Sequence, residues 1–247
     1  MLWITPEGKP SGNVKTMMDA KMKGMVMAGM MALCLVLGLW ATLGDAWLEA
    51  DEDEMDDDMT STSGLNNVVV TMSELDGECD AALEFWEEMD DSDAEYECED
   101  DDTLVVTMSI SEMCDDATSD LDDAKDAGLE GDALDDAQEE VDDVCDAASA
   151  GTMGTIGMWV GVVCALVAAL VLILPMAGVD AMDAMPDVAK MIVSWGAGGF
   201  MLLGMLMWYF MLPDGDSSMA IHLWMAGAAM TIGLGSTAIG QFIPENE

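Results

Sequence analysis

Basic side chains are almost missing from this chain. Its 247 residues include six lysines, one histidine and no arginine, against 50 aspartates and glutamates, so the formal net charge is −44 at pH 7. A protein that binds nucleic acid neutralises the charge of the phosphates with lysine and arginine side chains. The sequence therefore excludes nucleic acid as a partner.

Catalytic motifs are missing as well. The sequence contains no G-x-S-x-G elbow and no Walker-type phosphate loop. The acids are too numerous for two of them to stand out as a general acid and a general base. His222, the one histidine, lies in an apolar run beside Trp224, where an interfacial polar residue is typical. We expect that the protein is not an enzyme.

The acids and the apolar residues occupy different parts of the chain. Forty of the 50 acids lie between residues 49 and 150, with Lys125 as the one basic residue there. The remainder contains four apolar runs, each with the roughly 20 residues that cross a hydrocarbon layer of about 30 Å. The acidic segment 49–150 is expected to form a small α+β domain between the first and second runs. We predict an α-helical membrane protein, a four-transmembrane-helix bundle with helices at 24–43, 153–174, 191–212 and 219–243.

The lysines predict how the chain crosses the membrane. Four of them precede the first run, in the tail 1–23, and Lys190 lies between the second and third runs. The positive-inside rule places both segments in the cytoplasm. Four crossings then put the C-terminus in the cytoplasm as well, and they put residues 49–150 on the extracytoplasmic side of the cell membrane.

A cleaved signal peptide is the alternative interpretation of the first run, with cleavage after a Gly44-x-Ala46 type of site. The run is about 20 residues long, whereas the apolar part of a signal peptide has about 7–15. We therefore expect the run to be retained as an anchor. Cleavage would leave three spans, and the acidic domain would be outside in either case.

Small residues recur every four positions along three of the runs, in the first as Gly24, Ala28 and Ala32. Such rows let two helix backbones approach closely in lipid. They predict a compact bundle, a homo-oligomer or a subunit of a larger membrane complex. The residues are Gly157, Gly161 and Ala165 in the second run, and Gly233, Ser236, Thr237 and Gly240 in the fourth.

Ionisable residues are missing from the middle of every run, which argues against an ion-coupled transporter. Aromatic residues gather near the ends of the runs, where amphipathic rings prefer the headgroup zone. We expect these rings to anchor the helices at the membrane surface. They belong to Trp40, Trp47, Trp159, Trp208, Tyr209 and Trp224.

The acidic segment contains one string of five residues twice, as Val69-Val70-Thr71-Met72-Ser73 and as Val105-Val106-Thr107-Met108-Ser109. The β-branched side chains in each copy predict a strand. The acid-rich stretch Glu49–Met59, by contrast, has no apolar stripe. We expect it to be a solvated linker.

A helix is expected after each of these strands. Thr71 with Glu74, and Ser109 with Glu112, have the S/T-x-x-E spacing of a capping box. Apolar residues then recur at helical spacing in three sets, and the last set leads directly into the second span. The second and third sets predict a helical hairpin with one thin apolar stripe. The sets are Cys79, Ala82, Leu83 and Trp86; Ala117, Leu121, Ala124 and Gly128; and Leu134, Ala137, Val141, Val144 and Ala148.

The acidic segment also holds four cysteines. An even number in an oxidising compartment predicts two disulfides. The strand-then-cysteine pattern favours Cys79–Cys98 with Cys114–Cys145, and the pairing Cys79–Cys114 with Cys98–Cys145 respects the repeat as well. A zinc site is disfavoured, because the segment has neither the C-x-x-C spacing nor a histidine.

The acids have a general and a specific interpretation. In general, dense Asp and Glu keep a domain soluble in salty surroundings, where ions screen their repulsion. Specifically, one alternation of acids mimics part of an EF-hand calcium loop, although Tyr96 stands where that loop needs glycine. Low-affinity binding of Ca²⁺ or Mg²⁺ is the most that we expect there, and no other cofactor is predicted. The candidate ligands are Asp91, Asp93, Glu95, Glu97 and Asp102.

Two resemblances concern the membrane part. Met201-x-x-x-Met205, followed by the glycine-rich fourth run, resembles the Ctr family of copper transporters, in which an MxxxM helix precedes a GxxxG helix. The resemblance implies Cu(I) as cargo, but it covers only these two patterns, and many of the 27 methionines are expected to be apolar filler. The layout of spans is also similar to claudin-like tetraspan proteins, although Gly38-Leu39-Trp40 lies inside the first span.

These patterns predict a non-enzymatic structural or interaction protein of the cell envelope. Its acidic ectodomain would be presented to cations or to a basic partner, and its membrane helices would contact lipid and further copies or subunits. The alternative is a copper or other cation transporter, or a channel subunit, that uses Met-lined helices.

Overall fold

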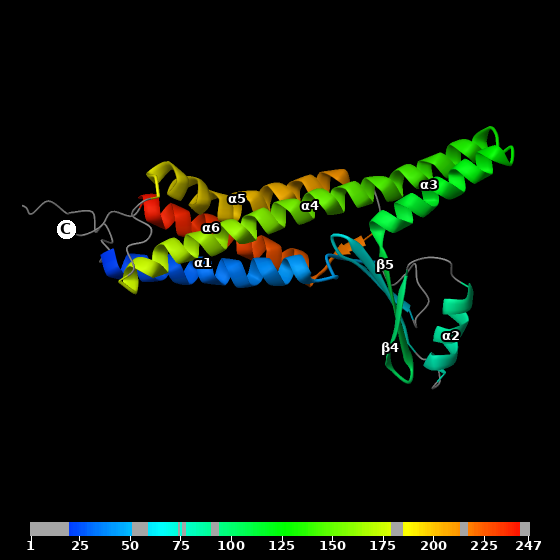
Figure 1. Ribbon diagram of the computed structural model, residues 1–247, viewed down its shortest axis with the longest axis horizontal. Helices are drawn as coiled ribbons and strands as arrows, with labels where there is room; N and C mark the ends of the chain where they lie inside the picture. The colour runs from blue at the N-terminus through cyan, green and yellow to red at the C-terminus, as the bar shows by residue number, and fades with distance from the viewer. Residues whose placement is uncertain are drawn as a thin grey trace, which may run out of the picture.

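The computed structural model describes residues 20–50, 59–73, 75, 78–89, 94–178, 185–212 and 217–242. Within these residues the protein is mostly helical, with an antiparallel sheet of six strands beside one end of a helix bundle (Figure 1). The helices are α1 (Ala20–Leu43), α2 (Cys79–Met89), α3 (Ile110–Asp126), α4 (Asp132–Met176), α5 (Asp187–Met211) and α6 (Ile221–Phe242). The strands are β1 (Leu48–Ala50), β2 (Met59–Ser63), β3 (Asn67–Met72), β4 (Glu95–Asp100), β5 (Thr103–Ser109) and β6 (Ser217–Met219).

Four of the described helices, α1, α4, α5 and α6, are long and apolar enough to cross a membrane, which indicates a multi-pass membrane protein. Three of them match the predicted runs to within a few residues at each end. The exception is α4, a helix of 45 residues, of which the predicted run 153–174 is only the later part.

The outer surface of the bundle is apolar. Large side chains such as Val36, Val163 and Leu203 are exposed on it. A continuous surface of this kind would drive association in water, whereas in a bilayer it meets hydrocarbon. The backbone of these helices is satisfied internally, as a membrane span requires.

The small residues of the second run hold α4 against α5. A Cβ atom at Gly157 would collide with the backbone of Gly204, and one at Gly161 would collide with the side chain of Met201. Ala165 is fully buried one turn further along α4. Because neither glycine has a side chain, the two helices approach closely and gain van der Waals contact.

The small residues of the fourth run hold α6 against two neighbours. Gly233 lies against Gly198 of α5, and the Thr237 hydroxyl donates to the backbone carbonyl of Ser194 over 2.8 Å. On the side facing α1, the Ser236 hydroxyl donates to the carbonyl of Met27 over 3.2 Å, and Gly240 lies beside the Met27 side chain. These rows of small residues are therefore used inside one chain, and association of copies needs another face.

The sheet has the strand order β4-β5-β3-β2-β1-β6, and every neighbouring pair is antiparallel. The two copies of the repeated string form β3 and β5, which confirms both predicted strands. They pair with each other, with Val70 opposite Val106, Val69 opposite Thr107 and Thr71 opposite Val105. At the far edge, β6 comes from the connection between α5 and α6 and pairs with β1.

A buried tryptophan joins the sheet to the bundle. Trp47 is fully buried, its Nε1 donates to the carbonyl oxygen of Ala41 over 2.8 Å, and its ring meets the Trp208 ring edge-on with centroids 5.2 Å apart. Its backbone N–H donates to Ser63 over 2.8 Å, and its carbonyl accepts from the N–H of Ala220 over 2.9 Å. One residue thus connects α1, α5, β2 and the start of α6.

The β2–β3 turn inserts into the side of α4. Leu65, at the tip of the turn, is buried with the bundle core. Gly151 and Gly154 of α4 make room for it, since a Cβ at Gly151 would collide with the Leu65 carbonyl oxygen. Beside it, the Asn66 amide donates to the Thr155 hydroxyl over 2.9 Å. The sheet is therefore attached to the bundle at two places.

The structure corrects two expectations. The anchor interpretation is wrong for Trp47 and Trp208, which are buried because they pack on each other. The linker prediction is wrong at both ends of its range, because Glu49 lies in β1 and Met59 begins β2; residues 51–58 lie outside the described residues. The remaining predicted anchors have exposed rings on the bundle surface, and they are Trp40, Trp159, Tyr209 and Trp224.

A leucine at Gly204 tests the close contact of α4 and α5. A Cβ at this position would lie 2.8 Å from the Cα of Gly157, so the helices must separate. Overpacking costs about 1–3 kcal/mol, and we expect Gly204→Leu to lower the free energy of unfolding in detergent by about that amount. The control is Gly199→Leu on the same helix, where a Cβ meets open space. Denaturant titrations that show equal losses for both variants would contradict the packing.

Truncation of Trp47 tests the junction. Replacing a buried tryptophan with alanine costs about 3–5 kcal/mol, so Trp47→Ala should strongly lower the melting temperature and weaken the near-ultraviolet dichroism of the buried tryptophans. Trp47→Phe keeps most of the ring and loses the bond to Ala41, which is a loss of about 1 kcal/mol. If the alanine variant melted like the wild type, Trp47 would not hold the two parts together.

Candidate functional site

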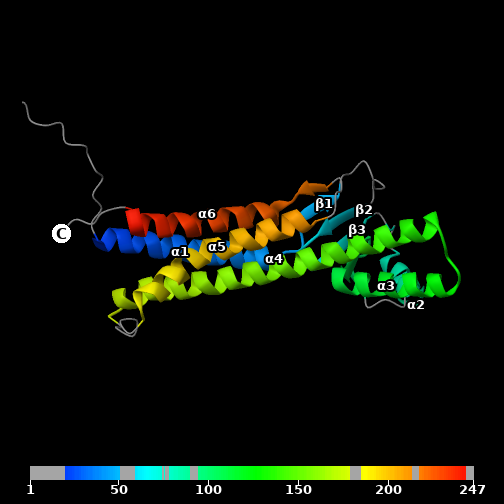
Figure 2. The same cartoon turned by 90° about the horizontal axis from the view of Figure 1, so that it is seen from above.

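The acidic end of the molecule is built around a helical hairpin. α3 and the first half of α4 run side by side in both views and project beyond the sheet (Figures 1 and 2). The turn between them begins and ends with Gly128 and Gly131, whose φ angles of 93° and 73° favour glycine. α4 then continues without interruption into the bundle. No linker separates the charged hairpin from the membrane part.

The hairpin buries a thin apolar seam between α3 and α4, and its acidic side chains are exposed. Leu121 of α3 is buried against α4, and the predicted apolar row of α4 is half-buried along its whole length. The sixteen acids between residues 110 and 150 are all exposed. Lys125, the one basic residue of the hairpin, forms an exposed ion pair with Asp122 over 3.2 Å. The predicted hairpin and its seam are confirmed, except that Gly128 lies exposed in the turn after α3 and takes no part in the seam.

Two disulfides tie this end together. Cys79–Cys98 joins the first residue of α2 to β4, and Cys114–Cys145 joins α3 to α4. The structure thus has the pairing that the strand-then-cysteine pattern favours, in place of Cys79–Cys114 with Cys98–Cys145. The reason lies in the topology: Cys79 and Cys98 belong to the small core under α2, whereas Cys114 and Cys145 face each other across the hairpin.

α2 covers one face of the sheet at the β4–β5 side. Its residues Cys79, Ala82 and Leu83 pack on Leu104 and Val106 of β5. This confirms the predicted apolar face of α2 as far as Leu83; the side chain of Trp86 lies outside the described residues. The core of the acidic end is small, which gives the disulfides a large share in its stability.

The two capping boxes differ from the prediction. Thr71 lies inside β3 and α2 begins only at Cys79, so Thr71 does not cap that helix; Glu74 lies outside the described residues. Ser109 does occupy the N-cap position of α3. Its hydroxyl, however, lies 2.9 Å from the Ser111 hydroxyl and makes no capping bond.

The candidate calcium ligands lie on a strand and a turn. Glu95 and Glu97 are exposed on one face of β4, which explains their alternation, and Asp102 lies in the turn before β5. Asp91 and Asp93 lie outside the described residues. Within the described part of the chain, no three Asp, Glu, His or Cys side chains come together in a way that could hold a metal ion.

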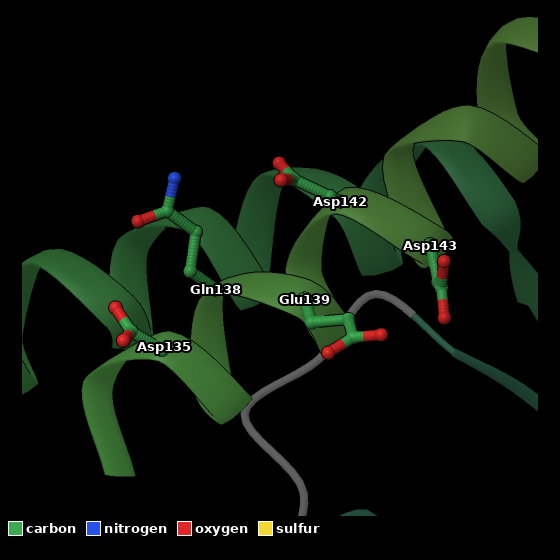
Figure 3. A pocket seen from close by; sticks show the side chains of 5 residues that line it. All are labelled: Asp135, Gln138, Glu139, Asp142 and Asp143. Atoms are coloured by element: carbon green, nitrogen blue, oxygen red, sulfur yellow. The ribbon is translucent and has the colours of Figure 1, made fainter. Parts of the chain in front are cut away.

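A shallow acidic hollow of about 340 Å³ lies on α4 (Figure 3). Four carboxylates and one amide line it, and they come from successive turns of a single helix. In Figure 3 they point in different directions and do not converge on one point. The hollow therefore presents a broad negative surface. The residues are Asp135, Gln138, Glu139, Asp142 and Asp143.

The methionines that resemble a copper motif lie inside the bundle. Met201 is almost fully buried, and its side chain fills the space beside Gly38 and Gly161, where α1, α4 and α5 meet. Met205 is half-buried against the same core. The flexible thioether of Met201 thus serves as filler between backbones that come close.

No protein-family model matches the chain, and no curated protein matches its sequence. Inferences about function therefore start from the residues and their arrangement. The arrangement comprises an anionic hairpin, a sheet with uncharged central strands and a buried junction to four apolar helices.

The junction is the part that sequence reasoning missed. Trp47 and Trp208 look like membrane anchors by position, and Ser217–Met219 is too short to give a strand signal. A usable signal was the run Gly64-Leu65-Asn66, in which an apolar residue stands between turn formers. A leucine in such a turn indicates that the turn is buried against another element.

The Cys114–Cys145 bond is expected to hold the hairpin closed. It closes a chain separation of 31 residues, which is worth about 3 kcal/mol in the chain-entropy model. Cys114→Ser with Cys145→Ser should therefore raise hydrogen exchange across residues 110–145 while α5 and α6 stay protected. The matched control, Cys79→Ser with Cys98→Ser, should loosen α2 and leave the hairpin protected. Equal exchange of the hairpin in both variants would show that the bond does not act locally.

Proposed function

We propose that the protein is a non-enzymatic structural or interaction protein of the cell envelope, which presents a rigid anionic hairpin to a basic partner outside the cell. The observation that carries this proposal is the continuity of α4. One helix of 45 residues begins in the acidic hairpin and ends in the bundle. The charges are therefore held at a set place relative to the membrane.

The charge of the hairpin suits a polycationic partner better than a single metal ion. The sixteen exposed acids point outward around two helices, and only Lys125 offsets them. At 0.1 M salt the screening length is about 10 Å, so neighbouring carboxylates on the hairpin act together on a nearby cation. A basic segment that lies along the hairpin could contact many of them at once. Divalent cations would bind the same surface diffusely and weakly.

The proposed orientation places the hairpin outside the cell. The ends of the described chain, near residues 20 and 242, lie at the opposite end of the bundle from the sheet (Figure 1). Lys21 and Lys23 lie at that opposite end, and the positive-inside rule assigns it to the cytoplasm. The two disulfides support the same assignment, because disulfides persist in oxidising compartments.

The transporter interpretation has less support. Met201, the central residue of the copper resemblance, is used in packing. Buried polar or charged side chains are rare in the described bundle, where they are Lys23, Ser236 and Thr237. The hydroxyls of Ser236 and Thr237 donate hydrogen bonds to backbone carbonyls of neighbouring helices. A transport path would need polar groups directed at a cargo.

Binding of an oligolysine peptide to the full chain in phosphatidylcholine vesicles tests the proposal. Each exposed charge pair contributes about 0.2–1 kcal/mol, so removing three hairpin charges should weaken binding at least about threefold. The hairpin variant carries Glu130→Gln, Glu139→Gln and Glu140→Gln. The control variant has the same change of net charge on exposed residues elsewhere in the domain, at Glu78→Gln, Glu84→Gln and Glu99→Gln.

The control variant should lose much less affinity than the hairpin variant. Equal losses would mean that the hairpin has no special role, and no binding by the wild type at low salt would overturn the proposal. Melting in CaCl₂ and in NaCl at equal ionic strength gives a second measurement. A stabilisation by calcium that survives in the hairpin variant would place a cation site elsewhere.

A further inference from the structure

The sheet has one face that no described helix covers. Along β3, β5 and β4, the residues that face α2 form the small core, with Val70, Val106 and Tyr96 in one row across the strands. The opposite face carries the alternate residues of the same strands. Among the described elements, α2 packs on the first face and α3 only follows the end of β5.

The uncovered face consists of hydroxyl and β-branched side chains in two rows. The strand register puts Thr62, Val69 and Thr107 in one row, and Thr60, Thr71 and Val105 in the next. All six side chains are half-exposed or exposed. We call these six residues the hydroxyl face. Glu95 and Glu97 continue the two rows on β4, the strand at the outer edge.

The hydroxyl face is uncharged in a domain that is charged almost everywhere else. β2, β3 and β5 contain no acidic and no basic residue, although the segment 49–150 holds 40 acids. One face of these strands has to be apolar, because it forms the core. The other face has no such requirement if it meets water, and the domain elsewhere places Asp and Glu at exposed positions. The lack of charge therefore distinguishes this face from the rest of the domain surface.

The position of the sheet tells what lies opposite this face. In Figure 1 the bundle lies on one side of β4 and β5, and α2 lies on the other. The hydroxyl face, being opposite α2, looks back towards the end of the bundle. In Figure 1, β4 and β5 also extend sideways past the outline of the bundle. Along that part of the sheet the face looks towards the space beside the helices, which lipid would fill if the four apolar helices cross a bilayer.

The exposed aromatic rings give the level of the membrane surface at this end. Trp40 and Trp224 are 58% and 66% exposed on the outside of the bundle, as rings in the headgroup zone would be. α1 ends at Leu43, about 4.5 Å beyond Trp40 at a rise of 1.5 Å per residue. The sheet begins at Leu48, directly after the buried Trp47. Since headgroups add about 5–8 Å to each side of the hydrocarbon, the sheet starts at the level of the headgroups.

We propose that the hydroxyl face lies on the lipid headgroups of the membrane that the bundle spans. The threonine hydroxyls would donate to phosphate and ester oxygens of lipids without net charge, and the two valines would bury apolar surface among them. Glu95 and Glu97 stand at the outer edge, where the cost of removing carboxylates from water keeps the sheet from sinking deeper and where their charge disfavours pairing with another strand. This contact does not depend on what the hairpin binds.

A fluorescent label on each face of the sheet tests this contact in the full chain. The label is attached to Thr71→Cys or Thr107→Cys, in a Cys34→Ala, Cys164→Ala background that keeps both disulfides. The matched controls are Ala81→Cys, exposed on α2, and Ala133→Cys, exposed on the hairpin. Each protein is reconstituted in phosphatidylcholine vesicles that contain a lipid with a nitroxide on its headgroup.

We expect the nitroxide lipid to quench the labels at positions 71 and 107 and to leave those at 81 and 133 bright. Equal quenching at all four positions, or none at 71 and 107, would overturn the proposal. A label at 71 or 107 could instead be shielded from water without being quenched. If that shielding falls when the protein is diluted in lipid, a second copy of the chain covers the face. That result would also overturn the lipid contact. Two positions on different strands guard against a variant that misfolds, which the loss of protease resistance would reveal.

Discussion

The structure depends on the burial of Trp47 at the junction between the apolar helix bundle and the sheet. A tryptophan near the end of a membrane span usually keeps its ring among the headgroups, but here the indole N–H is satisfied by the Ala41 carbonyl and the ring rests on Trp208. The backbone on both sides of the ring pairs with Ser63 and with Ala220. The Trp47 side chain and backbone thereby join the sheet to the helix bundle. The burial is favourable because each polar atom of the residue has a partner.

The junction contributes to the stability of the acidic end of the molecule. Its own core is small, and its negative charges repel one another. The attachment of β1 to β6, the insertion of Leu65 beside Gly151 and the two disulfides compensate by tying the sheet and the hairpin to the bundle. The apolar helices are in turn held together by close contacts at Gly157 and Gly233 and by two hydroxyls that donate to backbone carbonyls, and Lys23 is the one charged side chain buried among the described residues.

Local patterns predicted the elements better than the contacts between them. The apolar runs, the repeated strands and the seam from Leu134 to Ala148 depend on periodicity within a segment, and the structure has all of them. The junction could not be predicted in this way, because a tryptophan near the end of a span gives the same signal whether its ring meets lipid or Trp208. The register of β3 with β5 could not be predicted from local patterns either, because it depends on how two separate segments pair. At Thr71 a local pattern predicted a feature that the structure lacks, because the spacing of a capping box occurs here inside a strand. The rigid placement of the hairpin likewise follows from α4 continuing through Gly151 and Gly154, where glycines alone would favour a break.

The uninterrupted course of α4 also has a mechanical consequence. About 20 residues of this helix stand clear of the apolar run, which is an arm of about 30 Å at 1.5 Å per residue. Such an arm magnifies motion: a tilt of about 10° in the bilayer moves its far end by about 5 Å by the same geometry. The arm leaves the sheet close to the contact between Leu65 and Gly151. A force applied to the tip of the hairpin would pass along the backbone hydrogen bonds of α4 to the place where α4 packs against α5.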